Sequence, residues 1–149
     1  MRLVIQRVQK ASVEINSTIY SAIENGLLVL IGIEDSDTDE DIEWLSGKLL
    51  AMRIFNDEND KMNLSVQDIG GQILLVSQFT LHAQVKKGNR PSFIRAAGTE
   101  KAIPLYEAFV AKCKKSGLIV KTGEFGADTK VELINDGPVT IVVDSKQRE

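Results

Sequence analysis

A chain of 149 residues with a net charge of −3 is long enough for one domain with its own core, and too acidic for a protein that coats nucleic acid without specificity. One histidine and one cysteine, His82 and Cys113, exclude an intrachain disulfide, a structural zinc cluster and a site with several histidine ligands to a metal. No apolar run approaches the roughly 20 residues of a membrane-spanning helix, so we expect a soluble protein in a reducing cytoplasm, without a membrane partner.

The first third of the chain reads as short strands followed by a helix. Asn16-Ser17 and Asn25-Gly26 are turn pairs, so we expect the strands beside them to form antiparallel hairpins. Thr38 is the expected N-cap of the helix, because acidic residues follow it and apolar residues then recur at helical spacing. The expected strands are Arg2–Val8, Ser12–Ile15, Thr18–Ile23 and Leu27–Ile33, and the helical stripe is Ile42, Leu45, Leu49 and Met52.

A polar motif ends the next expected strand, Gln72–Phe79. Ser77, Gln78, Phe79 and Thr80 supply a hydroxyl, an amide, an aromatic ring and a second hydroxyl in succession. If the strand continues through the motif, Ser77 and Phe79 share one face and Gln78 and Thr80 the other, because strand side chains alternate. The motif is either part of a site or a strand end that turns polar as it reaches solvent.

Basic residues cluster directly after this motif. Lys86, Lys87, Arg90 and Arg95 have no acidic residue among them, whereas segment 34–43 is densely acidic. Such a cluster either contacts phosphate groups or is a solvated loop, and the sequence leaves both interpretations open.

The last third combines a second helix with three strands. The helix is expected from Pro104 to Ser116, where Gly117 ends it. Cys113 lies on its apolar face, so we expect a core residue rather than a reactive thiol. The expected strands are Leu118–Thr122, Lys130–Ile134 and Val139–Val143, which completes an α+β pattern with strands in the majority.

Gly137 and Pro138 allow two interpretations. Asp136-Gly137 between two β-branched runs is a strong signal for a plain hairpin turn. Pro138 stands at the head of a strand, where its missing N–H removes a ladder bond, and an X-Pro bond is the one common place for a cis peptide. The pair therefore also suits a site that needs two backbone carbonyls held in a fixed direction.

A protein nucleophile would lack a general base in this sequence. On an extended strand Thr80 and His82 point the same way but lie about 7 Å apart, too far for a direct hydrogen bond between small side chains. We therefore expect His82 at the surface, and Ser77 and Thr80 are weak nucleophiles without a base.

Five segments together resemble the D-aminoacyl-tRNA deacylases, small editing enzymes that hydrolyse D-amino acids from tRNA. The resemblance extends over nearly the whole chain in order and spacing. One position departs, because Thr129 stands where the family usually carries Met and is expected to help line the pocket for the terminal adenosine. The segments are Met1–Val8, Ser77–Leu81, Lys87–Phe93, Gly123–Asp128 and Asn135–Thr140.

The resemblance implies the fold, the partners and the chemistry. The expected fold is α+β, with a mostly antiparallel, β-barrel-like sheet and two main helices in a single domain over residues 1–149 of a homodimer. The expected substrates are D-aminoacyl-tRNAs and glycyl-tRNA mischarged on tRNA(Ala). The 2′-OH of the terminal ribose is expected to assist ester hydrolysis, without a metal or another cofactor.

Roles for individual residues also follow from the resemblance. Gly137 and Pro138 form a Gly-cisPro motif that reaches in from the partner subunit, where its carbonyls hold the α-ammonium group and an L side chain collides with backbone. The catalytic pocket is assigned to Ser77, Gln78, Phe79 and Thr80, and adenosine or tRNA binding to Phe125, Gly126, Thr129, Lys86, Lys87 and Arg90.

Two functions of other classes remain open. A hydrolase of small esters with Thr80 as nucleophile would form an acyl-enzyme that can be trapped. A non-catalytic RNA-binding β module would bind tRNA without turnover.

Overall fold

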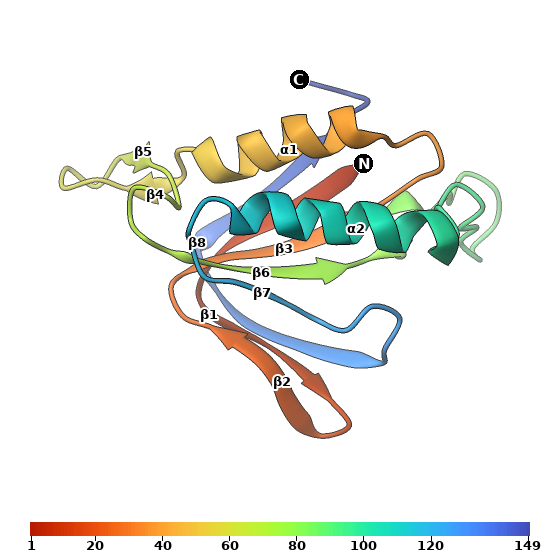
Figure 1. Ribbon diagram of the computed structural model, residues 1–149, viewed down its shortest axis with the longest axis horizontal. Helices are drawn as coiled ribbons and strands as arrows, with labels where there is room; N and C mark the ends of the chain where they lie inside the picture. Colours follow the sequence, from red (N-terminus) through yellow and green to blue (C-terminus); the bar gives the residue numbers. More distant parts are fainter.

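Two long antiparallel strands organise the computed structural model, which describes residues 1–149 (Figure 1). β1 (Arg2–Ile15) pairs along its whole length with β8 (Thr129–Asp144). On the other side of β1, β3 (Gly26–Gly32) pairs with its first half and β2 (Thr18–Ile23) with its second half. All three pairings are antiparallel, but β3 pairs with β1 rather than forming a hairpin with β2.

The sheet continues as parallel strands and nearly closes on itself. β6 (Gln72–Ser77) pairs in parallel with β3, and β7 (Val120–Thr122) pairs in parallel with β6. The hydroxyl of Ser21 in β2 donates a 2.7 Å hydrogen bond to the carbonyl oxygen of Thr122 in β7. Because this bond joins the two ends of the strand order, the sheet is barrel-like, as the family resemblance implies.

Two helices lie side by side over one face of the sheet (Figure 1). α1 (Asp39–Ala51) begins after its N-cap Thr38, as predicted, and α2 (Thr99–Lys114) packs beside it. A short 3-10 helix, η1 (Phe79–His82), follows β6. The remaining strands, β4 (Phe55–Asn56) and β5 (Met62–Leu64), form a separate small hairpin.

Apolar side chains fill both sides of the sheet. The larger cluster lies between sheet and helices and includes Leu3, Phe109 and Cys113, all fully buried. The smaller cluster includes Val13 and Leu74 and lies inside the curl of the sheet. Burial raises the pKa of the Cys113 thiol to about 12, which keeps it protonated and unreactive, so the expectation of a core cysteine is confirmed.

The plain hairpin at Asp136-Gly137 is wrong, because the two strands expected around it are one strand, β8. β1 offers β8 a continuous partner and is itself one strand rather than the two expected. Gln6 pairs with Thr140 and Val8 with Asn135, so β8 advances five residues while β1 advances two. The extra residues, Gly137 and Pro138 among them, form a bulge instead of a turn.

Two other expected boundaries shift. α2 begins at Thr99 instead of Pro104, because the carbonyl of Gly98 accepts the first helical bonds, including one of 2.9 Å from the N–H of Ala102. Pro104 lies inside the helix, at an exposed position. β7 begins at Val120 rather than Leu118, since the chain pairs with β6 only from there.

Candidate active site

A pocket of about 600 Å³ opens at the end of β6, beside the first turn of α2. One part of its lining is the predicted motif Ser77, Gln78 and Phe79. Another part is the segment between β7 and β8, and the pocket therefore gathers two motifs that lie almost fifty residues apart in the chain. The residues of that segment are Glu124, Phe125, Gly126, Ala127, Asp128 and Thr129.

The polar motif does not continue as a strand. β6 ends at Ser77 and the chain turns into η1, so the expected strand Gln72–Phe79 is wrong at its end. The alternation of Ser77 and Phe79 against Gln78 and Thr80, which required an unbroken strand, therefore does not occur. The backbone N–H of Gln78 still donates to the Ile31 carbonyl oxygen at 2.8 Å, which anchors the turn to β3. Thr80 is not part of the pocket lining, and its hydroxyl accepts a hydrogen bond from the Gln78 side-chain amide.

An aromatic pair supports the other part of the lining. The ring of Phe125 packs on that of Tyr106, with centroids 5.8 Å apart. The Tyr106 hydroxyl donates to the Leu75 carbonyl oxygen at 2.9 Å, and burial raises the pKa of Tyr106 to about 12. Gly126 has a φ of +78°, which favours glycine, and Thr129 begins β8 at the pocket edge.

Gly137 and Pro138 lie away from this pocket in the same chain. The lining includes β8 only at its start, at Thr129 and Val131, and about 20 Å of strand separates Val131 from Gly137 at 3.3 Å per residue. Both residues of the pair are exposed, and the bond between them is cis.

The buried side chain of Arg7 holds the bulge in place. Its Nε donates to the Asp136 carbonyl oxygen at 2.8 Å, and its Nη1 donates to the Ile54 carbonyl oxygen at 2.7 Å. Sequence reasoning did not single out Arg7. Its signal was an arginine at the inward position of the apolar alternation Leu3, Ile5, Arg7.

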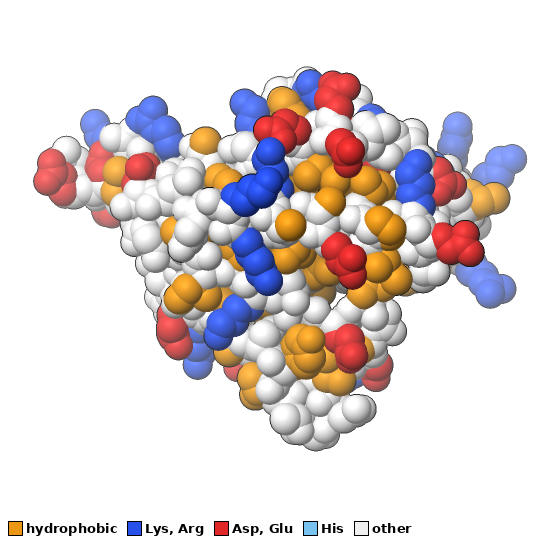
Figure 2. All heavy atoms as spheres, viewed as in Figure 1, with side chains coloured by type: hydrophobic (Ala, Val, Ile, Leu, Met, Phe, Trp, Pro, Cys, Tyr) orange, Lys and Arg blue, Asp and Glu red, His pale blue; other side chains and the backbone are white.

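The basic loop is tied to the pocket. Lys86, Lys87 and Arg90 are exposed. The loop that carries them lies beyond the start of α2, at the right-hand edge of the molecule (Figure 1), where Lys and Arg side chains project in Figure 2. The ring of Phe93, later in the same loop, meets that of Phe79 edge-on, with centroids 5.1 Å apart. The cations therefore stand beside the pocket without lining it.

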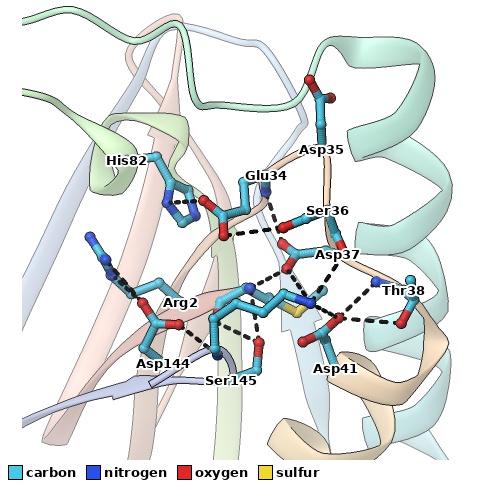
Figure 3. A network of polar contacts seen from close by, with 12 residues as sticks. Arg2, Glu34, Asp35, Ser36, Asp37, Thr38, Asp41, His82, Asp144 and Ser145 are labelled. Carbon is cyan, nitrogen blue, oxygen red and sulfur yellow. Dashed lines mark hydrogen bonds and ion pairs between the residues drawn. The ribbon is translucent and has the colours of Figure 1, made fainter. Parts of the chain in front are cut away.

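His82 is buried, which contradicts the expected surface position. It ends η1, with Nδ1 3.5 Å from Oε2 of buried Glu34, and neither ring nitrogen has a hydrogen-bond partner (Figure 3). The 3-10 turn that replaces the strand directs the ring inward, against Gly32. Glu34 also binds Arg95 at 2.9 Å, so it connects η1 to the basic loop, a role that sequence reasoning missed.

Neither a metal cluster nor a membrane helix is found. No three His, Cys, Asp or Glu side chains gather closely enough to hold a metal ion. No helix is both long and apolar enough to cross a membrane.

Comparisons with known proteins agree on one family. A family model described as D-Tyr-tRNA(Tyr) deacylase matches residues 4–144. The D-aminoacyl-tRNA deacylase of Flavobacterium johnsoniae is 62% identical over 150 residues, and that of Akkermansia muciniphila 60% over 152 residues, with full coverage of both chains in each case. A solved structure, the c-Myc DNA unwinding element binding protein, is 44% identical with a TM-score of 0.92, covering 97% of this chain and 99% of its own.

Proposed function

The chain belongs to the D-aminoacyl-tRNA deacylase family of hydrolases, and we propose that its pocket holds the aminoacylated terminal adenosine of the tRNA. One observation carries the proposal: the motif Ser77–Phe79 and the segment Phe125–Thr129 line the same pocket. In this assignment Phe125, Gly126 and Thr129 receive the adenosine, and Ser77, Gln78 and Phe79 surround the ester.

The chemistry we propose uses the substrate's own hydroxyl. Water attacks the carbonyl carbon of the ester, the bond to the 3′ oxygen breaks, and that oxygen takes up a proton as the D-amino acid leaves. The 2′-OH assists this transfer, because a group already fixed beside the ester needs no further ordering. Donors at Ser77 and Gln78 and the open N–H groups of the first turn of α2 favour the developing oxyanion.

A protein nucleophile has little support from the geometry. The Thr80 hydroxyl is outside the pocket lining and is held by Gln78. Neither ring nitrogen of His82 makes a hydrogen bond, so the imidazole does not bind the Thr80 hydroxyl. Thr80 accordingly acts as a positioning residue for the Gln78 amide.

We propose that chirality is read by Gly137 and Pro138 of a partner subunit. Both residues are exposed and lie far from the pocket of their own chain, so a homodimer would allow them to enter the other one. Their carbonyls would accept from the α-ammonium group and leave no space for an L side chain. Glycine has no side chain to reject, so glycyl-tRNA(Ala) would also be a substrate.

The rest of the tRNA is expected to meet the basic loop. Lys86, Lys87 and Arg90 stand beside the pocket and would contact backbone phosphates. We place the reaction in the cytoplasm, where aminoacyl-tRNA is made and used.

Matched tRNAs test the proposal. A D-aminoacyl-tRNA should be hydrolysed much faster than its L counterpart. Equal rates on the two would show that Gly137 and Pro138 do not reject L substrates. A D ester on tRNA ending in 2′-deoxyadenosine should bind but not turn over, while Thr80→Ala should retain measurable rate. Full activity on the deoxy substrate, or an acyl group trapped on Thr80, would contradict the proposed chemistry.

A further inference from the structure

A second groove adjoins the pocket. It has a volume of about 380 Å³ and lies between α2 and the strands β2 and β7. Glu124 and Phe125 line both cavities, so the two share a wall. Hydrophobic side chains with acidic ones among them gather below α2 on this face of the molecule (Figure 2). Its lining includes Tyr20, Ile103, Tyr106, Glu107, Lys114 and Thr122.

The groove offers an aromatic platform and unpaired charges. Tyr20 is 54% exposed although it is a large aromatic residue. Glu107, Lys114 and Glu124 are exposed as well, and none of them forms an ion pair with another residue of the chain. All three are therefore open to a ligand.

These groups suit one kind of ligand, a single-stranded nucleotide whose base carries an amino group. Aromatic side chains bind unpaired bases by stacking, and a carboxylate accepts a hydrogen bond from the exocyclic amine of cytosine. A lysine in the same groove can meet the backbone phosphate. A ligand that was only a phosphate would instead be repelled by the two carboxylates.

We propose that this groove binds the cytidine that precedes the terminal adenosine of the tRNA, with its base on Tyr20 and its amino group at Glu107 or Glu124. The inference rests on the proposed function, because the shared wall places the next nucleotide in the groove only if the adenosine occupies the pocket. Tyr20 then contributes to affinity for tRNA and takes no part in the reaction at the ester.

Two D-aminoacyl esters separate this contact from the chemistry. One is a full D-aminoacyl-tRNA, and the other is the same D-amino acid esterified to adenosine alone, which has no cytidine. Tyr20→Ala should raise KM for the tRNA about tenfold, within the range for loss of one stacked base, with kcat unchanged. On the adenosine ester, Tyr20→Ala should have the KM and kcat of the unmutated enzyme. Tyr20→Phe, which keeps the aromatic ring, should have the KM and kcat of the unmutated enzyme on both substrates.

A change in the tRNA tests the carboxylates. Uridine in place of the penultimate cytidine should raise KM for the unmutated enzyme several-fold, because uridine lacks the amino donor. The same replacement should change KM little in a Glu107→Gln, Glu124→Gln double variant, whereas Glu58→Gln, in the separate β4–β5 hairpin, should behave as the unmutated enzyme.

The outcomes are distinguishable. An unchanged KM for tRNA in Tyr20→Ala, or an equal loss on both substrates, would overturn the cytidine site. Equal rates of the unmutated enzyme on D and L esters would instead remove the proposed selection of chirality and leave the cytidine site standing, because that site rests only on the adenosine occupying the pocket.

Discussion

Gly137 occupies a position that no other residue fits. Its φ is +149°, and a Cβ added there would lie 2.6 Å from Cγ2 and 2.7 Å from the backbone nitrogen of Val139. Both contacts are shorter than real Cβ atoms make. The Arg7 side chain also restricts the position, because its Nη2 would lie 3.3 Å from the added carbon.

Replacing this glycine should therefore displace the bulge. We expect Gly137→Ala to lower the free energy of unfolding by about 1–3 kcal/mol, measured by urea denaturation, and to abolish most deacylation of D-aminoacyl-tRNA. The matched control is Gly47→Ala in α1, where nothing lies within 4 Å and alanine should be neutral or stabilising. Normal activity in Gly137→Ala would show that the site does not depend on this backbone.

Thr129 gives a second prediction for a single residue. It lines the pocket where the family usually carries Met, and threonine is shorter, β-branched and polar. Thr129→Met should lower KM for D-aminoacyl-tRNA with little change in kcat, in steady-state assays. Thr18→Met, at an exposed position at the start of β2, is the control. If KM does not move, residue 129 does not contact the adenosine.

Among the elements, α1 depends on the end of the chain. The Asp41 carboxylate accepts from the Thr38 N–H at 2.8 Å and from Lys146 Nζ at 2.9 Å, in a network that also includes Asp37 and Ser145 (Figure 3). Burial alone would raise the pKa of Asp41. The hydrogen bonds from Ser145, Lys146 and Thr38 outweigh it and hold the pKa well below the ordinary value of 3.8.

The lowered pKa fixes the sign of the pH dependence. Because the folded pKa lies below the unfolded one, the charged carboxylate stabilises the fold fully above about pH 4, and this stabilisation is lost as the pH falls further. Asp41→Asn should lower the free energy of unfolding by about 1–3 kcal/mol at pH 7. In acid, the Tm of the variant should approach that of the unmutated protein. Asp39→Asn, in the same helical turn, should have a smaller effect. A Tm difference that stays constant from pH 7 to pH 2.5 would contradict the assignment.

The sequence predicted the elements whose ends are determined by neighbouring residues, and it failed for strands whose extent depends on pairing with a distant strand. Thr38 begins α1 because its neighbours in sequence cap the helix. β8 is continuous only because β1, at the other end of the chain, pairs with all of it. The same reason explains the site. The pocket residues Ser77–Phe79 and Phe125–Thr129 were predicted from the family resemblance. The alternation around Arg7 marks it as inward-facing, but the partners of Arg7 and Glu34 lie far away in the sequence and no local pattern identifies them.

For the whole molecule, the distance between the pocket and Gly137-Pro138 predicts that each active site is built from two subunits. If the pair enters a partner's pocket, each active site of a homodimer combines one subunit's pocket with the other's bulge. A subunit with Gly137→Ala then keeps a sound pocket, and a subunit with Phe79→Ala keeps a sound bulge. A heterodimer of the two has one intact site and one doubly defective site.

Mixing the two inactive variants should therefore restore activity. After co-expression in equal amounts, half of the dimers are mixed and each has one of two sites intact, so we expect about a quarter of the unmutated rate per subunit on D-aminoacyl-tRNA. Purification through two different tags should raise this to about half, because only mixed dimers remain. Each variant mixed with itself is the control and should stay inactive. Without any recovery in the tagged heterodimer, the bulge would have to serve the pocket of its own chain, across the roughly 20 Å of strand that separates them.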